Sequence, residues 1–132
     1  MGVRFPSVFV SGANAVSIPT TVETVVATLP PLTLPLDGAV VFLLGVCSWT
    51  VGTAATSAAV RIRRGTTTAG VLVGSNGTDT NPVTAGVNAQ FTVAVFDQPG
   101  AVGPVQYVLT VVQFAATGNG ATQWSQLMAF AL

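Results

Sequence analysis

The sequence of 132 residues contains no histidine, no lysine and a single cysteine, Cys47. Without histidine the chain cannot form a Ser-His-Asp triad, a histidine-ligated zinc site or an imidazole proton shuttle. Without lysine it lacks Schiff-base chemistry and the lysine of a phosphate-binding loop. One cysteine forms neither an internal disulfide nor a four-thiolate metal site. The sequence therefore predicts a protein that is not an enzyme and that holds neither a metal nor a cofactor.

Charge is also scarce. Charged residues make up 6% of the chain, against roughly 25% in an average soluble domain. Four arginines are balanced by four acids, and this does not supply the basic surface that nucleic-acid binding requires. A folded monomer of this mass exposes roughly 6,500 Å², and eight charged side chains cannot cover such an area. We therefore expect partner subunits to cover part of the surface, and we expect no nucleic-acid partner.

An uncharged stretch of 23 residues, long enough to be considered as a membrane span, lies between Asp37 and Arg61. Its most apolar part, residues 39–51, is only about half as long as a helix that spans a bilayer. Its residues are mainly β-branched and aromatic, and such residues favour strands. The sequence therefore predicts no membrane span.

Short runs rich in valine, threonine and phenylalanine alternate with glycine, proline, asparagine and aspartate along the whole chain. This pattern is typical of an all-β protein. Eight strands are expected near residues 7–11, 21–29, 39–50, 58–64, 70–73, 89–96, 106–114 and 124–132. Their spacing predicts a single domain over residues 1–132, an eight-stranded antiparallel β-sandwich of the jelly-roll type, with residues 1–20 considered as an extended arm.

Three of the expected strands, 89–96, 106–114 and 124–132, carry apolar side chains on both faces. A strand of a small sandwich normally keeps one polar face. A second apolar face implies a second burial surface, which another copy of the chain supplies most simply. The residues expected at this oligomer interface are Phe91, Phe96, Trp124, Met128 and Phe130.

Arg61, Arg63 and Arg64 form the one cluster of charge, within the segment AVRIRRG. On a strand, Arg61 and Arg63 share a face because side chains alternate. Guanidinium groups placed in this way suit an anion or phosphate site. The alternative is that they form ion pairs with Glu23, with Asp97 or with an acid of a neighbouring subunit, and the balanced charge of the chain favours this alternative.

The aromatic residues Trp49, Tyr107 and Trp124 allow two interpretations. Together they could form a platform on which a sugar ring stacks. All three lie within apolar strands, and this position favours a place in the core or at an interface.

The strand GVCSWTVGTAATSAAVRIRRG, the hairpin TTTAGVLVG and the strands FTVAVFDQPG and QYVLTVV resemble small single jelly-roll proteins of virus particles. This group includes phage capsid, decoration and spike modules and the tumour necrosis factor-like knobs. The resemblance extends over residues 21–132. It implies a homotrimer that is located in the virion and has other capsid or spike proteins as partners.

Composition and resemblance together predict a non-enzymatic structural protein of a virus particle, which assembles through apolar β-surfaces as a homo-oligomer. The alternative function is a lectin-like β-sandwich module that binds a glycan or receptor on a host surface.

Overall fold

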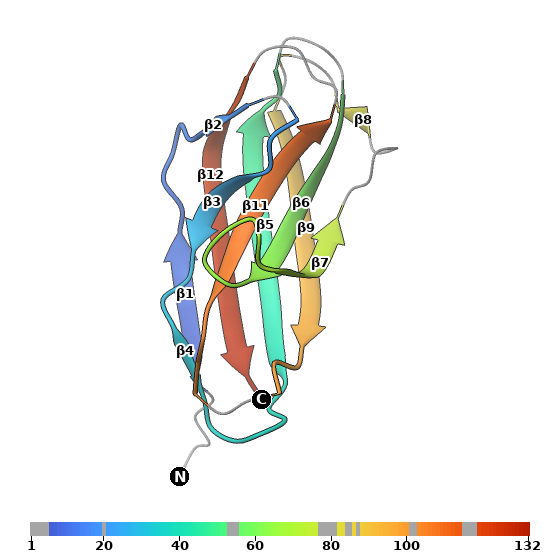
Figure 1. Ribbon diagram of the computed structural model, residues 1–132. Coiled ribbons are helices and arrows are strands. Elements are labelled where there is room, and N and C mark those ends of the chain that lie inside the picture. Colours follow the sequence, from blue (N-terminus) through green and yellow to red (C-terminus); the bar gives the residue numbers. More distant parts are fainter. Residues whose placement is uncertain are drawn as a thin grey trace.

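The computed structural model describes residues 6–19, 21–52, 56–76, 82–83, 86, 88–100, 103–114 and 119–132. All the regular secondary structure within these ranges is β-strand, so the all-β prediction is confirmed (Figure 1). The strands are β1 (Ser7–Ser11), β2 (Ser17–Ile18), β3 (Thr24–Thr28), β4 (Leu32–Leu34), β5 (Val41–Thr50), β6 (Thr56–Arg64), β7 (Val71–Asn76), β8 (Pro82–Val83), β9 (Asn88–Asp97), β10 (Gly103–Val105), β11 (Tyr107–Phe114) and β12 (Gly120–Ala131). No helix in the described ranges is long and apolar enough to cross a membrane.

The eight longest strands fall on the eight predicted runs, and β2, β4, β8 and β10 are additional strands of two or three residues. Sheet A has the order β1-β12-β5-β9, with β2 also paired to β12. Sheet B has the order β3-β11-β6-β7, with β8 also paired to β6. The short strands β4 and β10 pair with each other. In Figure 1, sheet B lies in front of sheet A.

The order of the strands is that of a jelly roll. When the eight longest strands are numbered along the chain, sheet A contains the first, eighth, third and sixth, and sheet B contains the second, seventh, fourth and fifth. Two interlocked Greek keys produce this order, and all the pairs are antiparallel. The predicted antiparallel jelly-roll sandwich is confirmed.

The core lies between the two sheets because alternate side chains of the long strands point into this space. Along β5, the buried positions alternate with partly exposed ones from Val41 to Cys47. The largest side chains that are fully buried are Ile18, Leu29, Leu32, Leu43, Trp49, Ile62, Tyr107, Leu109 and Leu127. Aliphatic and aromatic side chains from both sheets therefore hold the sandwich together.

The described part of the N-terminal segment lies against sheet A. β1 pairs with β12 over five residues, from Ser7 opposite Phe130 to Ser11 opposite Gln126. β2 pairs with the beginning of the same strand, at Gly120 and Ala121. Residues 7–11 thus form an edge strand of the sandwich.

The sequence predicts that β11 needs a second copy to cover its outer face, and this prediction is wrong. Val108, Thr110 and Val112 lie on that face, and all three are buried within the single chain. The hydroxyl of Thr110 donates a hydrogen bond to Glu23 Oε1 at 2.6 Å. A carboxylate from the segment before β3 therefore covers the middle of β11.

Gly45 lies at the centre of the sandwich, where the inward-facing side of β5 approaches sheet B. A Cβ atom at this position would lie 2.5 Å from Leu109 Cδ1 and 3.3 Å from Val93 Cγ1. Because the core is closely packed, a larger residue must displace these side chains.

Replacing Gly45 by valine is therefore expected to lower the free energy of unfolding by about 1–3 kcal/mol or more. Urea denaturation of Gly45→Val at one protein concentration measures this loss. Thr28→Val is the control, since Thr28 is exposed on strand β3 of the other sheet. Equal stability of Gly45→Val and the wild type would contradict the packing described here.

Candidate assembly surface

The outer face of sheet A has an apolar end near the C-terminus of β12. The strand registers align Phe9, Met128, Leu44 and Ala94 in one row across β1, β12, β5 and β9. The next row in the same direction contains Ser7, Phe130, Phe42 and Phe96. We call this surface, completed by Leu132, the aromatic end of sheet A.

The rings in this surface contact one another but remain open to solvent. The Phe42 ring lies 5.2 Å from that of Phe96 and 6.5 Å from that of Phe130, measured between centroids. The exposed fraction is 62% for Phe96, 53% for Phe9 and 37% for Phe130. Isolated exposed apolar residues are common, but a contiguous group of this kind marks an interaction site.

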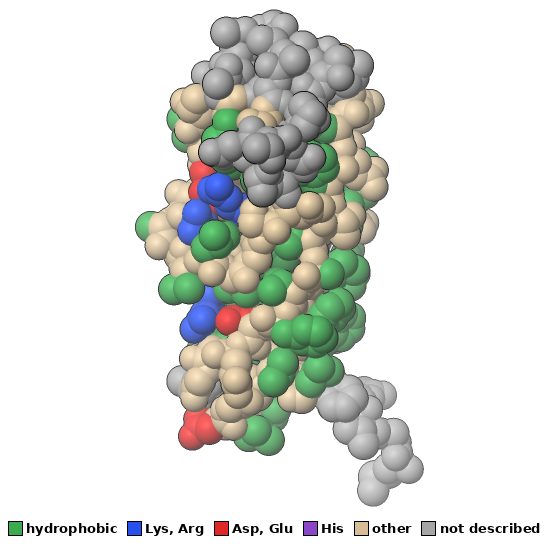
Figure 2. Space-filling view, turned by 90° about the vertical axis from the view of Figure 1, so that its right-hand side faces the viewer, with side chains coloured by type: hydrophobic (Ala, Val, Ile, Leu, Met, Phe, Trp, Pro, Cys, Tyr) green, Lys and Arg blue, Asp and Glu red, His purple; other side chains and the backbone are tan. Residues whose placement is uncertain are grey.

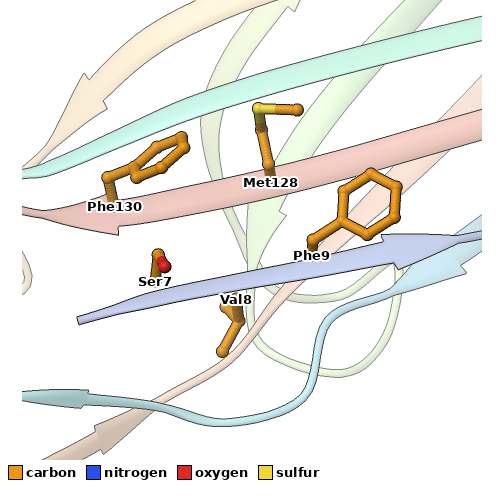
Figure 3. A pocket seen from close by; sticks show the side chains of 5 residues that line it. All are labelled: Ser7, Val8, Phe9, Met128 and Phe130. Atoms are coloured by element: carbon orange, nitrogen blue, oxygen red, sulfur yellow. The ribbon is translucent and has the colours of Figure 1, made fainter. Parts of the chain in front are cut away.

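Two hollows lie on either side of Phe130. One has a volume of about 350 Å³ and is lined by Ser7, Val8, Phe9, Met128 and Phe130. Figure 3 shows Phe9, Met128 and Phe130 on the same side of β1 and β12, whereas Val8 points to the opposite side. The other hollow, of about 320 Å³, is lined only by apolar residues, namely Phe42, Phe96, Phe130 and Leu132.

The other end of this outer face is polar but also uncharged. In one row across the strands, Val46 lies between Gln126 and Thr92. In the next row, Ser48 lies between Trp124 and Gln90. The described charged residues all lie elsewhere: Glu23, Asp37, Arg61, Arg63, Arg64 and Asp97. Figure 2 shows the hydrophobic side chains gathered at the lower right, on the side of sheet A, and the arginines on the left.

Four of the five predicted interface residues, Phe96, Trp124, Met128 and Phe130, lie on this outer face. Phe91 does not, and for this residue the prediction is corrected. Its ring meets the buried Trp49 edge-on, with the centroids 5.3 Å apart, and it packs against the core. The sequence pattern placed Phe91 and Phe96 on opposite faces of one strand but could not indicate which face was the inner one.

The outer face of sheet B is closed by an ion-pair cluster. Arg63 binds Glu23 with two nitrogens, Nε at 2.6 Å from Oε1 and Nη2 at 2.8 Å from Oε2. Arg61 Nη1 lies 3.1 Å from Glu23 Oε2, and the Arg61 guanidinium lies over the ring of Phe114 at 5.6 Å. Arg63 Nη1 also donates to the carbonyl oxygen of Gly70. Each of the three guanidinium nitrogens of Arg63 thus donates to an acceptor within the chain, and this favours the ion-pair interpretation over an open anion site.

The acidity of Glu23 follows from these contacts. Burial acts to raise its pKa, but the hydrogen bonds from Arg63 and Thr110 and the charges of Arg63 and Arg61 act to lower it. The lowering contacts dominate, so the pKa of Glu23 lies below its ordinary value of 4.5. The hydrogen bond to Glu23 in turn raises the pKa of Arg63.

Arg64 faces a second acid, Asp97, at the end of β9. Its Nη2 donates to Asp97 Oδ1 at 3.2 Å. Its Nε lies 3.0 Å from Oδ2, although the N–H bond is not directed at that oxygen. The Tyr107 hydroxyl donates to Oδ2 at 2.9 Å. Burial and the neighbouring Asp97 raise the pKa of Tyr107, so this hydroxyl stays protonated as a donor.

A sugar-stacking platform of Trp49, Tyr107 and Trp124 does not exist. Trp49 and Tyr107 are fully buried in the core, whereas Trp124 is on the outer face of sheet A. Cys47 is buried as well, and burial raises the pKa of its thiol to about 12. In the described part of the chain, no three His, Cys, Asp or Glu side chains gather to hold a metal ion.

The ion pairs of Glu23 predict a dependence of stability on pH. Because the folded state lowers the pKa of Glu23, the carboxylate stabilises the fold above pH 4.5 and loses this effect as the pH falls through its lower folded-state pKa. Glu23→Gln should therefore reduce the free energy of unfolding by about 1–3 kcal/mol at pH 7, with a smaller deficit at pH 3.

Urea denaturation at the two pH values measures this difference. Asp37→Asn is the control, because it removes one acid outside the cluster. A deficit of Glu23→Gln that is the same at pH 3 and pH 7 would contradict the proposed role of the carboxylate.

No protein-family model matches the sequence, and no curated protein sequence matches it. Solved structures do resemble the fold. A chain of the T13 particle of IBDV matches with a TM-score of 0.68 and 10% identity, over 98% of this chain and 32% of that one. The VP2 subviral particle of infectious bursal disease virus gives a TM-score of 0.63 and 10% identity, over 97% and 33% of the two chains.

A chain outside the viruses has the same fold. Latent PorU from Porphyromonas gingivalis matches with a TM-score of 0.52 and 9% identity, over 98% of this chain and 13% of that one. This chain thus spans about a third or less of the length of these neighbours. Identities of this size show the fold alone. At that level, the comparisons support a jelly-roll β-sandwich, a fold that this chain shares with chains of infectious bursal disease virus particles.

Proposed function

We propose that this protein is a non-enzymatic structural protein of a virus particle and that it assembles as a homo-oligomer through the outer face of sheet A. The single observation that carries the proposal is the aromatic end of sheet A. It exposes Phe9, Phe96, Phe130 and Leu132 together on a face without a charged side chain among the described residues. The fold shared with chains of infectious bursal disease virus particles supports the location in a virion.

Exposure of this apolar surface to water is unfavourable in free energy, and its burial favours assembly. Burial of apolar area contributes about 25 cal/mol per Å², and a partner covers about 800 Å² of each chain in a standard interface. The loss of association entropy and the desolvation of polar groups oppose this gain, and the fraction that remains is enough to hold an assembly together. An uncovered surface of this kind would instead favour aggregation, because zero net charge removes mutual repulsion.

The ion-pair clusters support the proposal that the chain is neither an enzyme nor a nucleic-acid-binding protein. Glu23 and Asp97 bind arginines, so these two acids are engaged as structural partners. The guanidinium donors of Arg63 are occupied, and they offer little to a phosphate. Of the three aromatic residues considered for the lectin-like alternative, only Trp124 is exposed.

Self-association is tested by sedimentation equilibrium of the purified chain at micromolar concentration. We expect a mass that is a multiple of 13.3 kDa, and electron microscopy at higher concentration should reveal ordered assemblies, alone or with other capsid or spike proteins. A soluble monomer at these concentrations would contradict the proposal.

A further inference from the structure

We propose that the aromatic end of sheet A is occupied by a second copy of this chain, which packs against it face to face in a two-fold contact. In this contact, the Phe130 ring of each copy lies against the hollow formed by Phe42, Phe96 and Leu132 of the other. The inference rests on the proposed function, since it presupposes self-association. It specifies the surface and the partner, and it proposes a two-fold contact in place of the homotrimer that the resemblance implies.

The relief of the surface is suited to a copy of itself. The Phe130 ring stands between two hollows, and the exposed rings of Phe9 and Phe96 stand at the two flanks. Ridges and hollows of similar size therefore alternate across one face. A two-fold contact requires one surface that is complementary to itself, and this alternation provides it.

The lack of charge also points to the same chain as the partner. The described side chains of the outer face offer no ion pair to a charged partner, and an arginine or aspartate of such a partner would be buried without a counter-ion. A partner face must therefore be uncharged and apolar. The outer face of sheet A itself has this composition, with an apolar end and a neutral polar rim that includes Gln90, Gln126 and Thr92.

The size of the face matches a sheet better than a peptide. β12, β5 and β9, counted as ten residues each, and β1 with five residues give a flat area of about 570 Å² before side-chain relief is added, at about 3.4 Å per residue and a strand spacing of about 4.8 Å. One partner's share of a stable interface is about 800 Å². A single extended segment would cover only about one strand width, whereas a second sheet can cover the whole face.

The regular registers allow such packing. β5 pairs with β9 over ten residues and β1 pairs with β12 over five, both without a register shift. The irregularity in β12, between Thr122 and Trp124, lies at the polar end. Two sheets that are regular in this way pack about 10 Å apart with their strands nearly aligned.

The edge of sheet A beside β9 is a poorer docking site. β7 approaches it so closely that a Cβ atom on Gly74 would lie 2.9 Å from Val95 Cγ1. Asn76 Nδ2 donates to the carbonyl oxygen of Thr92. The chain thus covers this edge itself.

The test uses opposite charges at the two positions that the proposal brings together. Phe96→Glu and Phe130→Arg are purified separately, and the mass of each is measured by sedimentation equilibrium, with circular dichroism to establish folding. We expect each variant alone to dissociate at least tenfold more readily than the wild type, because a charge is buried without a partner. An equimolar mixture should recover the dimer contact, since the carboxylate introduced in one copy then faces the guanidinium introduced in the other.

Matched variants keep the result interpretable. Leu72→Glu is the control, because Leu72 is 48% exposed but lies on β7 of sheet B, and it should associate like the wild type. If Phe130→Arg does not fold, Leu132→Arg replaces it, since Leu132 is 52% exposed and lines the same hollow.

Each outcome decides a different claim. Dissociation of both face variants, with recovery in the mixture, supports the two-fold contact. If the wild type is oligomeric and Phe96→Glu leaves its mass unchanged, the aromatic end of sheet A is not the contact. The inference is then overturned, and only the self-association in the proposed function stands. If the variants dissociate and the mixture does not recover, the face is an interface but the two-fold pairing of Phe96 with Phe130 is wrong. A monomeric wild type overturns the proposed function as well.

Discussion

The few charges of this chain are placed so that they bind one another, and the character of its surface follows from this. Glu23 holds Arg61 and Arg63 over sheet B, and Asp97 holds Arg64 beside the Tyr107 hydroxyl. Five of the six charged residues in the described part of the chain take part in these two clusters. The sixth, Asp37, lies between β4 and β5, so no charged residue in the described ranges lies on the outer face of sheet A.

The two outer faces therefore differ in how their side chains are covered. Sheet B covers its central strand β11 from within the chain, with the Glu23 carboxylate over Thr110. In the described part of the chain, no carboxylate covers the outer face of sheet A in this way. One row of that face consists of Phe130, Phe42 and Phe96 on three adjacent strands. Sheet A therefore exposes a group of aromatic rings on its outer face, whereas the exposed apolar residues Val71 and Leu72 of sheet B lie on its edge strand β7.

The sequence was sufficient to predict the strands and their alternation, because β-branched runs and turn residues act locally. It also named Phe96, Trp124, Met128 and Phe130 as candidate interface residues, and these four lie on the outer face of sheet A. Contacts between distant residues could not be predicted: Glu23 reaches Arg63 across 40 residues, so the cover over β11 had no local signal. Phe91 was misplaced for a similar reason, since its inward position depends on packing against Trp49.

The most direct test of the account is hydroxyl-radical footprinting of the wild-type chain, dilute and concentrated, with mass spectrometry of the labelled side chains. If the outer face of sheet A is the assembly surface, labelling of Phe96, Phe130 and Leu132 should fall on assembly, while Val71 and Leu72 on sheet B stay labelled. All five are exposed in the single chain. Unchanged labelling of Phe96 and Phe130 in an assembled sample would contradict the account.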